Sequence, residues 1–274
     1  MQERCCCSKE STGSIPIMRI IDKLDALFAK NDMAEAGRLL EYWEGEARAL
    51  NDRRGLSEIL SEEIGYYRSM GNAEKGLRAV DDALNLLNCI DVGDSVANAT
   101  IYLNCATTMK AFGKVNEALP YYDRAREVYE RLLPKDDYRL AGFYNNYATA
   151  MGELKRYGEA RENYQKAIDL LKSKGGFCEL AVSYVNLAQL VYDEAQDSGA
   201  ECGDELYNSG AECDEEVERL LDLAYECLDD KSIERNGNYA NTCRKCATAF
   251  EFFGYFIQKQ ELEQRAQEIY NSNK

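Results

Sequence analysis

One pattern of residues occurs twice in succession between residues 100 and 171, and it limits the possible fold more than any other feature of the sequence. Tyr144 follows Tyr102 by 42 residues, and the segments that begin at these tyrosines place small and aromatic residues at the same spacings. Each copy holds two apolar runs at helical spacing, joined by a turn at residues 112–115 or 154–157. Each copy is therefore predicted to be a hairpin of two helices. Self-similarity on this scale is typical of a solenoid of stacked repeats.

Small residues fall where the paired helices of each copy would cross closely. They are Ala106, Ala118 and Ala125 in the first copy and Ala148, Ala160 and Ala167 in the second. This pattern resembles the tetratricopeptide repeat (TPR) in its longer form, as found in kinesin light chain and in bacterial peptide-sensing regulators. The resemblance implies an all-α fold, a right-handed superhelical array (α-solenoid) of helix hairpins.

Weaker copies precede and follow these two, which gives about six hairpins. They are expected over residues 20–46, 56–87, 184–224 and 239–270. Before them, residues 1–16 are polar and lack helical periodicity, so we expect a flexible tail there and a single array over residues 17–274. The tail contains Cys5, Cys6 and Cys7.

The fifth copy contains an acidic insertion at about residues 194–216. Eleven acidic residues and no Lys or Arg lie between Asp193 and Glu218, and the sequence Ser-Gly-Ala-Glu-Cys occurs twice. Like charges without counterions favour a mobile, solvated loop at the turn between the two helices. The alternative is a lid whose acids attract a basic ligand.

Glycine and proline positions predict where individual helices end. Gly113 is expected to close its helix in the left-handed conformation, and Lys155 takes the same position one repeat later at some cost in stability. Pro120 is expected in the first turn of its helix, Pro134 is expected to stop that helix, and Asp136 or Asp137 is expected to cap the next.

The residue content argues against catalysis. Histidine is absent, which removes the usual general base of hydrolases and the commonest zinc ligand. Glycine-rich phosphate loops are also absent. We therefore expect no enzyme activity, no catalytic residue, no cofactor and no metal. Cys243 and Cys246 have the spacing of a metal or redox pair, but both fall on apolar positions of a helix and are expected in the core.

The formal net charge of −16 indicates the chemistry of the partner. Nucleic acid and anionic membranes need a basic surface, so a neutral or basic protein or peptide is expected instead. Without an apolar run long enough for a membrane span or a signal peptide, we expect a cytoplasmic protein, a monomer or weak homo-oligomer. Its eleven cysteines are expected to be reduced thiols in that compartment.

Asparagine recurs at one phase of the first helix in three consecutive copies, at Asn104, Asn146 and Asn186. Asn is a mediocre helix residue, and its carboxamide can pair with both polar groups of an extended peptide backbone. In related arrays Asn at this position holds the ligand backbone, so the resemblance implies a peptide-binding groove here. The groove would include Asn145, Thr107, Thr149, Lys110, Gln189 and Tyr192. The other interpretation is that these Asn side chains bond to the adjacent repeat or to water.

The sequence thus predicts a non-enzymatic interaction scaffold or adaptor that binds an extended peptide segment in its concave groove. A sensor of a small signalling peptide is the alternative within binding. A thiol-based metal or redox protein, using Cys5–Cys7 or Cys243 and Cys246, is the alternative from another class.

Overall fold

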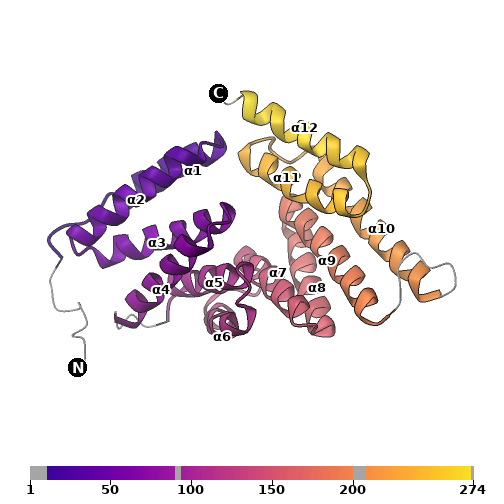
Figure 1. Cartoon of the computed structure of the whole chain (residues 1–274), viewed down its shortest axis with the longest axis horizontal. Helices are drawn as coiled ribbons and strands as arrows, with labels where there is room; N and C mark the ends of the chain where they lie inside the picture. Colours follow the sequence, from indigo (N-terminus) through magenta and orange to yellow (C-terminus); the bar gives the residue numbers. More distant parts are fainter. Residues whose placement is uncertain (1–10, 90–93, 200–207, 273–274) are drawn as a thin grey trace. The chain divides into compact units, whose positions relative to one another are not determined.

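The computed structural model describes residues 11–89, 94–199 and 208–272 (Figure 1). Over these residues the chain forms twelve α-helices and no strand, arranged as six successive hairpins. The prediction of an all-α array of about six helix hairpins is confirmed. The helices group into two compact units, Met1–Pro134 and Lys135–Lys274, each of which contains three hairpins.

The first unit pairs its helices in chain order, and each hairpin packs on the next. Its helices are α1 (Ile17–Ala29), α2 (Met33–Ala49), α3 (Arg53–Ser69), α4 (Ala73–Cys89), α5 (Val96–Ala111) and α6 (Val115–Leu132). Before α1, Thr12 N–H donates to Leu50 O at 2.9 Å, and Ile15 N–H donates to Asp52 Oδ2 at 2.8 Å. Residues 11–16 of the expected tail therefore contact the turn between α2 and α3, whereas Cys5–Cys7 lie outside the described residues.

The second unit has the same arrangement. Its helices are α7 (Tyr138–Glu153), α8 (Tyr157–Lys174), α9 (Phe177–Asp197), α10 (Asn208–Asp229), α11 (Gly237–Phe252) and α12 (Phe256–Ser272). The first helices of its hairpins lie next to each other, α9 between α7 and α11. Side chains on α7 and α9 can therefore reach one another across the repeat boundary.

Small residues and left-handed turns make these hairpins, as the sequence predicted. The six repeat alanines, from Ala106 to Ala167, are all fully buried, because only a methyl group fits where the helices cross. In five hairpins the turn contains one left-handed residue, with φ between 55° and 82°: Asn31, Gly71, Gly113, Lys155 and Gly254. The residue after each donates its N–H to the carbonyl five residues earlier, which satisfies an orphan carbonyl of the ending helix.

The prolines meet one expectation and miss another. Helix α6 ends before Pro134, and Asp137 caps α7 by accepting the Arg139 N–H at 2.9 Å. Pro120, however, is the sixth residue of α6 rather than part of its first turn. At that depth its missing N–H leaves the Asn116 carbonyl without the usual helical donor.

The described ends of the acidic segment differ from the expected loop. Helix α9 continues to Asp197 and α10 begins at Asn208, so both helices extend into it. Counterions come from the preceding repeat: Arg161 of α8 pairs with Glu194 at 2.7 Å and with Glu216 at 3.2 Å. The choice between loop and lid rests on residues 200–207, which lie outside the described residues.

Candidate functional site

The predicted site residues fall in both units. In the first unit, Asn104 on α5 donates from Nδ2 to Ser61 Oγ of α3 at 3.0 Å. Asn104 thus bonds to the adjacent repeat, one of the two interpretations that the sequence left open. Lys110 lies half-buried near the end of the same helix.

The second unit brings together two carboxamides from adjacent repeats. Asn186 of α9 donates from Nδ2 to Asn145 Oδ1 of α7 at 3.4 Å. Asn146, next along α7, donates instead to the Gly142 carbonyl of its own helix at 2.8 Å. All three side chains are half-buried. Since Asn104 belongs to the other unit, a continuous row of three Asn side chains stays a prediction.

The two predicted threonines serve the interior of their hairpins. Thr107 Oγ1 accepts the Tyr122 hydroxyl at 3.4 Å, and Thr149 Oγ1 bonds the Tyr164 hydroxyl at 3.0 Å. Each threonine also donates to a carbonyl one turn earlier in its own helix. These pairs satisfy tyrosine hydroxyls that are otherwise buried, so both threonines have a structural role.

Gln189 and Tyr192 continue the α9 face beyond Asn186. Gln189 donates to Asp193 Oδ1 at 2.9 Å. The ring of Tyr192 packs edge-on against Phe252 and Phe253, with centroids at 5.3 and 5.8 Å. An aromatic group therefore lies on the α9 and α11 side of the second unit.

Exposed apolar side chains extend this aromatic group around the turn into α12. Phe252 is 56% exposed, Phe256 65% and Ile257 80%. The predicted site did not include them, although three large apolar residues around a predicted turn are a signal that could have found them.

Arg68 is a further residue that the sequence analysis missed. It lies on α3, and its Nη1 donates to Thr108 Oγ1 of α5 at 3.3 Å. Burial lowers the pKa of this guanidinium, against a smaller opposing effect of Tyr122. The α3 and α5 side of the first unit thus carries a desolvated cation two turns from Ser61.

Burial disfavours thiolate chemistry at the pair of Cys243 and Cys246. Cys243 and Cys246 are fully buried, as predicted, and burial raises the pKa of Cys243 to about 11 and that of Cys246 further. Reactive or metal-binding thiols need a lowered pKa. In the described part of the chain no three His, Cys, Asp or Glu side chains are grouped so as to hold a metal. The expectation that all cysteines are reduced is wrong at Cys213, which is disulfide-bonded.

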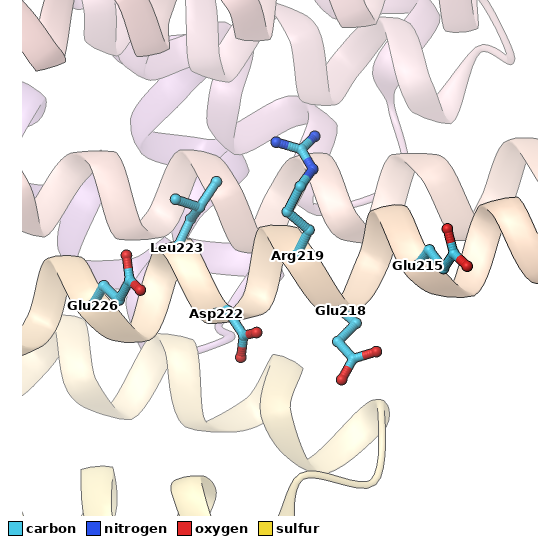
Figure 2. Close-up of a pocket in the computed structure, with 6 residues that line it drawn as sticks. All are labelled: Glu215, Glu218, Arg219, Asp222, Leu223 and Glu226. Carbon is cyan, nitrogen blue, oxygen red and sulfur yellow. The ribbon is translucent and has the colours of Figure 1, made fainter.

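One face of α10 forms a shallow acidic depression (Figure 2). Its side chains are Glu215, Glu218, Arg219, Asp222, Leu223 and Glu226, all from the one helix. Figure 2 shows Glu218 and Asp222 pointing away from Arg219 and Leu223. The four acidic side chains of this face are exposed, as on a solvated helix surface. Among the described helices, none has both the length and the apolar character of a membrane span.

Comparisons with known proteins agree with this geometry. Residues 98–137 match the family model of the tetratricopeptide repeat. BtubC (BKLC) from P. vanneervenii is 18% identical, with 89% of this chain and 91% of that chain covered and a TM-score of 0.50. The Rap protein complexed with competence and sporulation factor is 15% identical, with 94% and 74% covered and a TM-score of 0.50.

A third structure contains nearly identical TPR-like repeats, from a Podosopora anserina protein designated a kinesin light chain. It is 14% identical, with 77% of this chain and 92% of that chain covered and a TM-score of 0.50. No curated protein sequence matched. At these identities the likeness defines the fold, which is that of helical repeat arrays. The chain thus contains a tetratricopeptide repeat at residues 98–137 and has the fold of an array of such repeats, as the sequence resemblance predicted.

Proposed function

We propose that this protein is a non-enzymatic interaction scaffold that binds an extended peptide segment along the α7 and α9 face of its second unit. The observation that carries the proposal is the contact between Asn186 and Asn145, which places two backbone-pairing groups from adjacent repeats side by side. A peptide laid across the repeats would meet both groups.

The hydrogen-bonding capacity of this pair is only partly used. A carboxamide offers two N–H donors and an acceptor oxygen, and the mutual bond of 3.4 Å is long. A ligand amide can therefore replace or add to this bond at little cost. The carboxamides would fix the peptide backbone without selecting a particular side chain.

Side-chain selection would come from the aromatic group on α9 and α11. Tyr192 and Phe252 lie in contact, and Phe252 is more than half exposed. Exposed aromatic rings of this kind anchor apolar side chains of binding partners. The excess of acid in the chain favours neutral or basic residues elsewhere in the ligand.

The ligand can be found by selecting peptides displayed on phage against the immobilised full chain. We expect the enriched peptides to combine an apolar residue with Lys or Arg. A truncation series then separates the scaffold from the sensor alternative. A scaffold ligand keeps its affinity inside a longer polypeptide, whereas a short signalling peptide loses affinity when its ends are extended.

Asn146→Ala tests the carboxamide contribution. We expect the variant to bind a selected peptide about 1 to 2 kcal/mol more weakly, the scale of a hydrogen-bonding group left without its partner. Thermal stability should hardly change, because Asn146 bonds only within its own helix and Ala is the better helix former. Fluorescence anisotropy measures the affinity.

The matched control is Asn85→Ala, at an exposed Asn of α4 in the other unit. It should leave the affinity unchanged. Equal affinity of wild type and Asn146→Ala would remove Asn146 from the site, and failure to enrich any peptide would count against the proposed function itself.

A further inference from the structure

The first unit contains a polar pocket that the proposed peptide site does not use. It has a volume of about 280 Å³ and is lined by residues of α2, α3 and α4. Glu41 and Glu44 come from α2, Glu63 and Tyr67 from α3, and Lys75 and Arg78 from α4. Ala79 and Asp82 of α4 complete the lining.

Most charged groups of this pocket already have partners. Lys75 pairs with Glu41 at 2.6 Å, and Arg78 pairs with Glu44 at 3.3 Å. Arg48, also on α2, pairs with Glu44 at 2.7 Å and with Asp82 at 2.6 Å. Three cations thus neutralise three of the four carboxylates.

Glu63 is the carboxylate that remains. It is only 3% exposed, and its Oε1 has no hydrogen-bond partner among the described residues although it lies at the pocket. Burying an unpaired carboxylate is costly, so the group stays protonated instead. Burial first and the Glu44 charge second raise the pKa of Glu63 to about 8, against the opposing effect of Arg78 and Arg48.

We propose that this pocket binds the guanidinium of an arginine side chain, with Glu63 as the carboxylate that receives it. One further positive charge, added to the three cations already present, would balance the four carboxylates of the pocket. A planar guanidinium donates two parallel N–H bonds to a carboxylate and is weakly hydrated, which suits a half-enclosed site. Glu41, Glu44 and Asp82 already accept hydrogen bonds from Lys or Arg. A ligand that donates its N–H groups to Glu63 alone therefore fits better than a ligand that needs several unpaired carboxylates.

Proton linkage gives the proposal a specific signature. A guanidinium favours the ionised form of Glu63, so binding near neutral pH must release a proton. Affinity should therefore increase about tenfold for each pH unit between pH 6 and pH 8 and level off above the pKa of the free carboxyl. The other charged or titratable groups that face Glu63 or line the pocket with it are Glu41, Glu44, Arg48, Tyr67, Lys75, Arg78 and Asp82. Lys75 lowers the pKa of Glu41, and burial raises the pKa of Tyr67, so neither of these two groups titrates between pH 6 and pH 8.

Calorimetric titration of the full chain with N-acetylarginine amide tests the site. We expect saturable binding with a Kd on the order of millimolar, the range of a single anchored side chain. The neutral isostere N-acetylcitrulline amide should bind at least about tenfold more weakly, because it lacks the charge. Titrations in two buffers of different ionisation enthalpy should give a release of about one proton at pH 7.

Further probes identify the source of the cation. If free L-arginine binds with the same affinity as N-acetylarginine amide, the natural ligand is a small metabolite. If the amide binds more tightly, the ligand is an arginine within a polypeptide. N-acetyllysine amide should bind more weakly than the arginine probe, since a point charge cannot form the paired bonds.

Glu63→Gln is the decisive variant, and Glu58→Gln on the exposed side of the same helix is its control. At pH 8.5 we expect Glu63→Gln to lose at least about fivefold in affinity and all proton release, with Glu58→Gln unchanged. Absence of saturable binding, equal binding of citrulline, or unchanged binding to Glu63→Gln would overturn the proposal. If Glu63→Gln does not fold, the wild-type pH series decides: a flat affinity between pH 6 and pH 8 overturns it.

Discussion

Left-handed residues close the first helix in five of the six described hairpins, and the side chain at this position sets part of the stability of each turn. Gly113 has a φ of 77°, and a Cβ added there would meet no atom within 4 Å. Gly142 offers the same open space but lies in the right-handed interior of α7. The two glycines therefore differ only in backbone conformation.

Alanine at these two positions should change stability in opposite directions. Gly113→Ala should lower the free energy of unfolding by about 1 kcal/mol, because a Cβ is strained at positive φ. Gly142→Ala should raise it by about 0.5 to 1 kcal/mol, because Ala is the better helix former. Thermal unfolding followed by circular dichroism measures both, and shifts of the same sign would contradict this account of the turn.

Glu63 should also make stability depend on pH in the absence of any ligand. Its pKa is about 8 in the folded protein, above the ordinary value of 4.5. A raised pKa means that the favourable contribution is complete below the ordinary value and is lost as pH rises toward 8. Gln cannot ionise, so Glu63→Gln should match wild type near pH 5 and exceed it by about 1 to 3 kcal/mol at pH 8.

Urea unfolding at the two pH values measures this difference. Glu58→Gln, on the exposed side of α3, should show no gap that grows with pH. A constant difference between Glu63→Gln and wild type from pH 5 to pH 8 would mean that Glu63 titrates normally.

At the scale of elements, the fifth hairpin depends on the fourth for its counterions. Glu194 of α9 and Glu216 of α10 both pair with Arg161 of α8, and Asp197 of α9 bonds Lys155 at 2.8 Å and the Tyr157 hydroxyl. These contacts hold the acidic ends of α9 and α10 against the preceding repeat. Repulsion between the two helices is reduced as a result.

Arg161→Ala should lower the free energy of unfolding by about 1 kcal/mol, since the pairs are partly exposed. Thermal unfolding at low and high salt checks this value. The loss should shrink at high salt, which screens both the lost pairs and the remaining repulsion. Arg244→Ala, at an exposed position of α11, should change stability by less than about 0.5 kcal/mol at either salt concentration. A larger loss in high salt would show that Arg161 acts through packing.

At the scale of the whole molecule, each compact unit contains three hairpins, about the number that a repeat array needs for stability. We expect fragments 1–134 and 135–274, expressed separately, each to be helical and to unfold cooperatively, because repeats are stabilised by their neighbours. Circular dichroism during heating tests this. A fragment that ends at residue 113 separates α5 from α6 and should be much less stable than fragment 1–134. An unfolded 135–274 fragment would show that the division into units does not correspond to independent stability.

Sequence alone determined the hairpins, because their requirements are local. A close crossing needs Ala106 or Ala148, and a tight turn needs Gly113 or tolerates Lys155; both requirements recur with the repeat period. The prediction for Pro120 was wrong because the spacing of apolar residues fixes the first residue of α6 only approximately.

The tertiary structure decided the partners of polar side chains. Asn104, Asn146 and Asn186 share one phase in the sequence, yet they bond to Ser61, to Gly142 and to Asn145 respectively. In the sequence Glu63 is an ordinary acidic residue of a helix. In the structure α2 and α4 cover it, and it is the one unpaired carboxylate of its pocket. The hydrogen-bond partner of a polar side chain depends on which groups of adjacent repeats lie within about 3 Å of each other. The repeat period of the sequence does not predict those distances.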